Sequence, residues 1–553
     1  MDPDAGGASV MSLDAATLQV LIARLTGVAH EMGEVLRRAA FSPNIKERAD
    51  CSSALFTADG SLLVQAEHIP VHLGSMPASV AAAISAVGSA RLAPGDQVIL
   101  NDPFAGGTHL NDITLVAPCF VDGRLVGWAA NRAHHADVGG MAPGSIPPEA
   151  TEIQQEGFRM PPVVLSEDVV RLLCANSRTP KERRGDLDAQ IGANAIGVER
   201  LAAFAGAPLD ELLAYGERRM RAALAAVPDG TYSFADVLDS SGPGESQRSP
   251  VPVSVSVVIA GDSVVFDFTG SAPQTSGNVN AVLAVTESCV AFALRSAVDP
   301  TLPSNGGTMR PVRVEAPAGS VVAASTPAAV GAGNVEVSQR IADVCLGALA
   351  QAIPLRVGAA SQGTMNNLIV GGDGWVYYET VAGGQGGRPS VRGAGAGGAA
   401  MSGVHTGMTN SVDEGHQLGE PRPGQSGIHT NMTNTSNTPA EALERAFPMR
   451  VLQYRLRRSS GGAGFSPGGE GIERDLLMLE DVTVSLITER RNSQPWGLAG
   501  GEPGATGENW LLPQGDESRA ERLLDKCTLR LRRGDVLRML TPGGGGWGVA
   551  PLL

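Results

Sequence analysis

The sequence has 553 residues and a formal net charge of −15, with 43% hydrophobic, 18% charged and 4% aromatic residues. This length is too great for one hydrophobic core, so two to four domains are expected. An acidic chain is a poor electrostatic match for nucleic acid or an anionic membrane surface, and we expect neither as a partner.

The cysteines and the N-terminus bear on the cellular compartment of the protein. The six cysteines are scattered and form no Cys-x-x-Cys pair, which is typical of free thiols in a reducing environment. The first residues lack the basic and apolar pattern of a signal peptide, and there is no run of 18 apolar residues. We therefore expect a cytoplasmic protein.

The first 230 residues alternate helical and hairpin patterns. Helical patterns occur over 12–40, 76–90 and 186–225. Ser12 is the expected N-cap of the first helix. Alternation around Asp59-Gly60 predicts a hairpin over 53–66.

From about residue 231 the pattern changes. A hairpin is predicted over 251–268, apolar helices over 281–296 and 335–352, and a β-rich final hundred residues. The glycine-rich stretch 383–398 predicts a boundary or a long loop, and the glycine runs are interpreted as turns. The predicted fold is α+β and multi-domain, β-hairpin-rich with packed helices, divided into 1–230, 231–382 and 383–553.

A short repeat stands within the last of these segments. Residues 403–410 are repeated at 427–434, 24 positions later. One pair of copies is not a solenoid, and we predict a surface loop over 403–426. Its histidines, His405 and His429, are expected to be exposed to solvent, although a loop that reaches the functional site is an alternative.

The most informative stretch runs from 106 to 140. Two apolar runs flank Asp122-Gly123, the strongest short-range signal for a β-hairpin. Folding this hairpin brings His109, Asp112 and His134 to its open end. Neutral imidazoles and a carboxylate that meet at one point are metal ligands by their chemistry.

The sequence does not determine the register of this hairpin. A two-residue loop places Asn111 opposite His134, whereas a three-residue loop places Asp112 there. A slip of one residue moves a strand side chain to the other face, so either His134 or His135 points inward. The alternative to a metal site is a set of hydrogen-bonded histidines. Three of the nine histidines fall in this short segment between glycine pairs, which favours the metal.

A divalent ion with an open coordination position needs a further ligand. The candidates are Asp50, Glu67, His68, His72 and Asp137. Asp50 could instead be a turn carboxylate, and Asp137 could accept a hydrogen bond from a ligand imidazole. The chain has no Gly-x-x-x-x-Gly-Lys-Ser/Thr loop and no recognisable dinucleotide fingerprint, so no ATP or NAD site is expected within it.

Several motifs closely resemble the hydantoinase B family. They include Gly106-Gly107-Thr108-His109-Leu110-Asn111-Asp112 and Arg132-Ala133-His134-His135-Ala136-Asp137. Further segments that carry the resemblance are 47–52, 68–77, 333–340, 361–367 and 459–464. The family contains subunits of ATP-dependent hydantoinases, 5-oxoprolinases and lactamases, and the related ketone carboxylases. A departure from its pattern is the duplicated loop between about 393 and 425.

The resemblance implies a hydantoinase B-like fold and a division of labour within a cytoplasmic hetero-oligomer. A hydantoinase A-type partner would use ATP to phosphorylate the carbonyl oxygen of a small cyclic amide. This chain would then open the ring at a divalent metal (Zn, Mn, Co or Fe). Two alternatives are a subunit of an ATP-dependent ketone carboxylase and a non-catalytic scaffold.

The resemblance also assigns residues. It implies metal ligation by Asp50, His109, Asp112 and His134, with His109, Asp112 and His134 as the catalytic set. It raises the weight of Asp50 and favours His134 over His135. The residues expected around this centre or in its pocket are His68, His72, His135 and Asp137.

Overall fold

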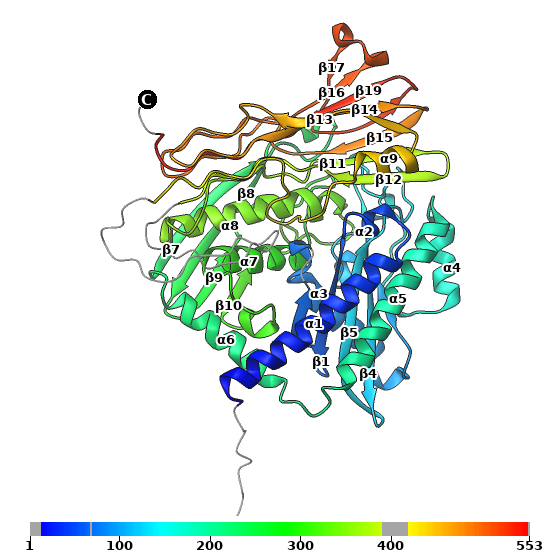
Figure 1. Cartoon of the computed structure of the whole chain (residues 1–553), viewed down its shortest axis with the longest axis vertical. Coiled ribbons are helices and arrows are strands. Elements are labelled where there is room, and N and C mark those ends of the chain that lie inside the picture. Colours follow the sequence, from blue (N-terminus) through cyan, green and yellow to red (C-terminus); the bar gives the residue numbers. More distant parts are fainter. Residues whose placement is uncertain (1–12, 67–68, 390–418, 551–553) are drawn as a thin grey trace, which may run out of the picture.

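The computed structural model describes residues 13–66, 69–389 and 419–550. Within these ranges the chain forms four β-sheets with helices packed on them (Figure 1). The prediction of a mixed α+β fold rich in hairpins is confirmed.

The first sheet carries the hairpin singled out in the sequence. Its strand order is β2-β1-β5-β4-β3-β6. The strands are β1 (Cys51–Thr57), β2 (Leu62–Ala66), β3 (Val98–Leu100), β4 (Asp112–Val121), β5 (Arg124–His134) and β6 (Val163–Val164). The helices of this region are α1 (Ala15–Ala39), α2 (Pro43–Lys46), α3 (Ser75–Val87), α4 (Glu167–Asn176) and α5 (Pro180–Ala202).

Side chains on successive strand residues point to opposite faces, and the first sheet is covered on both. Leu55 of β1 packs into the cluster formed with α1 and the end of α5, whereas its neighbour Phe56 packs with α3. Figure 1 shows α1 and α5 lying side by side over the sheet. The N-cap of α1 is Asp14 rather than the predicted Ser12, because the Asp14 carboxylate accepts hydrogen bonds from two first-turn backbone N–H groups.

The second sheet has the order β10-β9-β8-β7 and packs against the central helices. Its strands are β7 (Gly230–Leu238), β8 (Val251–Ala260), β9 (Ser263–Asp267) and β10 (Val312–Glu315). The neighbouring helices are α6 (Asp210–Leu224), α7 (Leu283–Ala297) and α8 (Ser338–Ala352), the last preceded by a π-helical turn, Gly333–Val337. The helical pattern predicted over 186–225 is divided between α5 and α6.

The third and fourth sheets lie at the opposite end of the molecule from the start of α1 (Figure 1). The third is β12 (Trp375–Thr380), β11 (Asn367–Gly372), β15 (Val482–Ile487) and β18 (Lys526–Leu531). The fourth is β13 (Met449–Arg457), β14 (Gly471–Met478), β19 (Val536–Leu540), β16 (Glu508–Leu512) and β17 (Glu521–Arg522), and α9 (Ala440–Ala446) precedes β13.

Two observations bear on how the chain divides. The third sheet pairs strands from both sides of the predicted 382/383 boundary. The largest cluster of buried apolar side chains reaches from Ile69 to Ile487 and so joins residues from all three predicted segments. The division into 1–230, 231–382 and 383–553 stays a prediction.

One segment, Pro70–Val87, is long and apolar enough by composition to cross a membrane. In the structure a short 3-10 turn, Pro70–His72, interrupts it before α3 begins. Half of its residues are buried inside the protein. It therefore packs as a core element of the first sheet.

The glycine runs near the C-terminus are packed backbone segments, and their interpretation as turns is wrong. Glycines at 383–387, 461–469, 497–504 and 543–546 lie against one another's backbone. Hydrogen bonds tie the segments together, for example from Gly384 N to the Pro542 carbonyl (3.0 Å) and from Gly544 N to the Gly469 carbonyl (2.9 Å). Glycine is needed because a side chain would not fit between backbones this close.

We predict that Gly544→Ala destabilises the protein by about 1–3 kcal/mol. An added Cβ at this position would overlap the carbonyl group of Gln385. The matched control is Gly192→Ala in α5, where no atom lies within 4 Å of the added Cβ. Alanine there should leave stability unchanged or raise it by up to about 1 kcal/mol. Denaturant unfolding measures both, and equal stability of the two variants would contradict this packing.

Candidate metal centre

The register of the β4–β5 hairpin combines the two predicted alternatives. The loop has two residues, Asp122 and Gly123, both with positive φ (49° and 75°), and Val121 pairs with Arg124. A β-bulge then shifts the pairing by one residue after Phe120, so that Asp112 lies opposite His134. The bulge inserts one extra residue into β5, which is how a short loop reaches the register expected for a longer one.

Three buried side chains meet at the open end of this hairpin. The Nε2 atom of His109 lies 3.1 Å from Oδ1 of Asp112. The Nδ1 atom of His134 lies 3.4 Å from the same oxygen and 3.2 Å from His109 Nε2. All three side chains are at most 3% exposed. The prediction that the hairpin brings them together is confirmed.

The size of this triangle fits a divalent metal. Metal–ligand distances of about 2.0–2.1 Å in tetrahedral or octahedral geometry place neighbouring ligand atoms about 2.8–3.4 Å apart. The three separations of 3.1–3.4 Å lie within that range. One imidazole nitrogen, His134 Nε2, is buried with no hydrogen-bond partner among the described residues. A rotation of the His134 ring would offer Nε2, in place of Nδ1, as the ligand atom.

The hydrogen bonds around the triangle also favour a cation inside it. The Nδ1 atom of His109 faces the carbonyl of Gly331 at 3.4 Å. If Nδ1 carries the proton, Nε2 turns its lone pair toward the Asp112 carboxylate. Two acceptors facing each other repel unless a proton or a metal ion lies between them.

The charge of Asp112 controls the electrostatics of the site. Burial favours the neutral acid, but the charges and hydrogen bonds of His109, His134 and His72 outweigh it and hold the Asp112 pKa well below its usual value. Burial opposes protonation of His109, yet the nearby Asp112 carboxylate raises its pKa. Burial lowers the pKa of His134. The carboxylate is therefore anionic and one imidazole is readily neutral, as metal ligands must be.

Three polar groups orient the second oxygen of Asp112. The hydroxyl of Thr108 donates to Oδ2 at 2.6 Å, and the Asn334 amide donates to it at 3.3 Å. Nε2 of His72 lies 3.4 Å from the same oxygen. His72 is itself held by Ser52, whose hydroxyl lies 2.9 Å from Nδ1. These contacts leave Oδ1 to face the two histidines.

Asp50 lines the same cavity as Asp112 and His134, but its carboxylate is not part of the close group of ligand atoms. The ligand atoms of His109, Asp112 and His134 all lie within 4.8 Å of one another, and that group does not include Asp50. The backbone carbonyl of Asp50 accepts a hydrogen bond from His134 N at 3.1 Å. The preceding residue, Ala49, has a positive φ of 54°. Alanine in this conformation is strained by about 1–2 kcal/mol, and the bend directs the chain into Asp50 beside the cavity.

The remaining predicted residues have different surroundings. Nε2 of His135 lies 2.9 Å from the Gln190 side chain on α5, and burial lowers the His135 pKa to about 4. The carboxylate of Asp137 accepts hydrogen bonds from the backbone N–H groups of Gly139 and Gly144 and pairs with Arg178 at 3.0 Å. It thus holds the loop after β5. Glu67 and His68 lie outside the described residues.

Distant segments complete the cavity, which sequence reasoning did not identify. The ring of Tyr378 on β12 stacks on His134 with a centroid distance of 4.5 Å and an interplanar angle of 16°. Thr433 and Thr435 also line the cavity, and Thr433 belongs to the second copy of the duplicated motif. No local pattern marks these residues, because they meet the hairpin only through the tertiary fold.

The duplicated segment is described only in part. The first copy, 403–410, with His405, lies outside the described residues. His429 in the second copy is half-buried, and its Nε2 lies 3.1 Å from the Asn437 side chain. The expectation of an exposed histidine is therefore wrong, because this loop packs toward the site.

Comparisons with known proteins match almost the whole chain. The family model described as hydantoinase B/oxoprolinase matches residues 14–550. An uncharacterized protein of Methanocaldococcus jannaschii is 39% identical, with 97% of this chain and 91% of that protein covered. The 5-oxoprolinase 1 of Arabidopsis thaliana is 36% identical over 97% of this chain, which spans only 42% of that longer protein.

Solved structures share the fold. The ATP-dependent caprolactamase of Pseudomonas jessenii superimposes with a TM-score of 0.85 at 27% identity, covering 98% of this chain and 93% of that chain. An acetone carboxylase gives a TM-score of 0.82 at 18% identity, covering 96% of this chain and 75% of that chain. At this identity the second likeness establishes the fold alone. The expectation of a hydantoinase B-like fold is confirmed.

We predict that His109→Ala and Asp112→Ala each abolish binding of a divalent metal, since each removes one corner of the triangle. The matched control is His135→Gln, which changes a buried histidine on the opposite side of the same strand end. Metal content per chain is measured by elemental analysis after dialysis, with circular dichroism to confirm folding. Full metal content in either alanine variant would refute the assignment, and loss in His135→Gln would mean that the wrong histidine faces the metal.

Asp50 needs its own test, because it lines the cavity without joining the triangle. If it supplies a fourth ligand, Asp50→Ala should weaken the affinity for metal about 10- to 100-fold without abolishing binding. A chelator competition titration compares this variant with the unaltered chain. An unchanged affinity would mean that Asp50 is a turn residue and not a metal ligand.

Proposed function

The chain belongs to the hydantoinase B/oxoprolinase family, and we propose that it is the metal-dependent subunit of an ATP-dependent cyclic amidohydrolase. The observation that carries this proposal is the buried triangle of His109, Asp112 and His134. Its substrates would be small cyclic amides of the hydantoin, 5-oxoproline or lactam type. The likeness to a caprolactamase and to a 5-oxoprolinase supports this substrate class.

The chemistry requires activation of the amide before the ring opens. Nitrogen donates electron density into the carbonyl group, so an amide is a poor electrophile. Phosphorylation of the carbonyl oxygen removes this protection and creates a leaving group. The chain has no recognisable phosphate-binding loop, so we assign the ATP-dependent step to a hydantoinase A-type partner.

The lengths of the relatives support such a partner. The chain covers 42% of the Arabidopsis 5-oxoprolinase, which leaves a large part of that protein for other steps. It covers 93% of the matched caprolactamase chain, a length close to its own. We propose that this chain works in a hetero-oligomer, as a separate subunit beside the ATP-using one.

The residues of this chain would receive the activated substrate. A divalent ion (Zn, Mn, Co or Fe) held by His109, Asp112 and His134, with Asp50, would supply Lewis-acid chemistry and acidify water near neutral pH. Thr108, His72 and Asn334 hold the Asp112 carboxylate in one orientation. The stacked ring of Tyr378 fixes His134 and forms an apolar wall that limits access of water.

The cavity at the site is small. The cavity beside Asp112 has a volume of about 20 Å³, which accommodates roughly one water molecule. A five-membered ring is several times larger. We therefore propose that binding of the partner or the activated substrate moves the wall formed by Thr433 and Thr435.

The carboxylase alternative shares this fold and needs a chemical test. A carboxylase incorporates the carbon of labelled bicarbonate into its product, whereas an amidohydrolase yields a ring-opened acid without that label. A scaffold subunit would bind no metal in the elemental analysis above.

We predict that the purified chain alone opens no unstrained lactam, 5-oxoproline or hydantoin ring at a useful rate and hydrolyses no ATP. Activity should appear when a hydantoinase A-type subunit is added, with ATP consumed in step with ring opening. The assay follows the ring-opened product by chromatography and ADP by a coupled reaction, with Asp112→Ala in the same complex as control. Ring opening by the chain alone, without ATP, would recast it as a self-sufficient metallohydrolase.

A further inference from the structure

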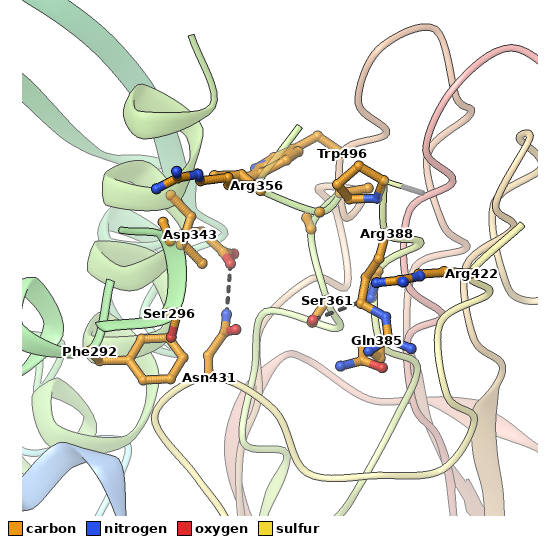
Figure 2. Close-up of a pocket in the computed structure, with 18 of the residues that line it drawn as sticks. Phe292, Ser296, Asp343, Arg356, Ser361, Gln385, Arg388, Arg422, Asn431 and Trp496 are labelled. Carbon is orange, nitrogen blue, oxygen red and sulfur yellow. Dashed lines mark hydrogen bonds between the residues drawn. The ribbon is translucent and has the colours of Figure 1, made fainter. Parts of the chain in front are cut away.

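A second cavity lies between the α7–α8 layer and the glycine-rich segments, separate from the metal centre. Its volume is about 140 Å³. Figure 2 shows Phe292, Ser296 and Asp343 on one wall and Ser361, Gln385, Arg388 and Arg422 on the other. The proposed function uses none of these residues.

Cationic side chains converge on this cavity in a chain that is acidic overall. Arg356, Arg388 and Arg422 all line it. An antiparallel backbone bridge joins Arg388 and Arg422, with Arg388 N donating to the Arg422 carbonyl at 3.1 Å. Two guanidinium groups are thus anchored side by side. Burial, with a smaller contribution from the Arg422 charge, lowers the pKa of Arg388.

Arg422 is not required by the acid in the same cavity. Asp343 already receives a hydrogen bond from Asn431 (2.9 Å) and forms ion pairs with Arg490 (2.8 Å) and Arg340 (3.4 Å). Arg422 forms no ion pair with any residue in the described ranges. Its charge is therefore available to a ligand.

A second, independent feature indicates that the cavity binds a ligand with hydrogen-bond acceptors. Trp496 lines the cavity, and its indole N–H is buried with no hydrogen-bond partner among the described residues. A buried donor without an acceptor costs free energy unless a ligand supplies the acceptor. An oxyanion offers acceptors to both the indole and the guanidinium groups.

The apolar part of the cavity limits what the ligand can be. Phe292, Val298 and Leu346 also line it. An inorganic ion would leave this surface uncovered. We propose that this cavity binds a small organic anion, whose carboxylate or phosphate group contacts Arg422, Arg388 and the Trp496 N–H and whose apolar body packs on Phe292 and Leu346.

Calorimetry on the full chain tests this proposal without ATP or a partner, so its failure leaves the proposed function untouched. The probes are benzoate and phenyl phosphate, with benzyl alcohol as the neutral probe of similar shape. We expect one or both anions to bind and the alcohol not to bind. The anion that binds more tightly identifies a carboxylate or a phosphate ligand. Equal binding of all three, or of none, would overturn the proposal.

Variants locate the binding. Arg422→Gln should weaken the anion about 10- to 100-fold, and Arg422 is half-exposed, so the variant should fold. Trp496→Phe keeps a ring but removes the donor and should weaken binding and remove the ligand-induced change in tryptophan fluorescence. The control is Arg313→Gln on β10, 74% exposed and paired with Glu315. Unchanged affinity in Arg422→Gln, or an equal loss in the control, would refute this site.

Discussion

The buried carboxylate of Asp112 is the group on which the site depends. One of its oxygens faces His109 and His134, and the other is held by Thr108, Asn334 and His72. An anion buried without compensation would cost several kcal/mol. The surrounding segments therefore have to deliver hydrogen bonds and cationic or metal charge to this one point. That requirement explains why residues from the first sheet, the turn before α8 and β12 all converge there.

A chain of buried polar groups fixes the far wall of the site. Tyr378 donates its hydroxyl to the Asn367 side chain at 2.8 Å, and the Asn367 amide donates to Glu336 at 2.8 Å. Burial, together with the nearby Glu489 carboxylate, raises the pKa of Glu336 to about 8. The wall is thus held in place by hydrogen bonds that run from Tyr378 through Asn367 to Glu336.

The sequence predicts the local part of this arrangement and not the rest. His109, Asp112 and His134 lie at the ends of one hairpin, and the Asp122-Gly123 turn makes that hairpin recognisable. The bulge, an extra residue in β5 opposite Cys119 and Phe120, leaves no comparable signal in the sequence. Without the bulge, the turn alone would set Asn111 opposite His134.

The site residues that are distant in sequence from the hairpin could not be predicted, for a related reason. Tyr378, Asn334 and Thr433 reach the hairpin through contacts more than 200 positions apart in sequence, and no periodicity records such contacts. The glycine runs led to a wrong prediction, because their composition indicated a local structure that they do not form. Their composition is typical of turns, yet several backbones packed side by side require the same residue, and only the tertiary structure distinguishes the two uses.

One short segment connects the two cavities. Asn431 lines the arginine-rich cavity, and Thr433 and Thr435 line the metal cavity. Asn431 has a positive φ of 56°, and its side-chain amide donates to Asp343. One residue separates Asn431 from Thr433, so this single short segment contributes side chains to both cavities. The segment that carries Thr433 and Thr435 along the metal cavity is therefore continuous in the chain with the segment that carries Asn431 along the arginine-rich cavity.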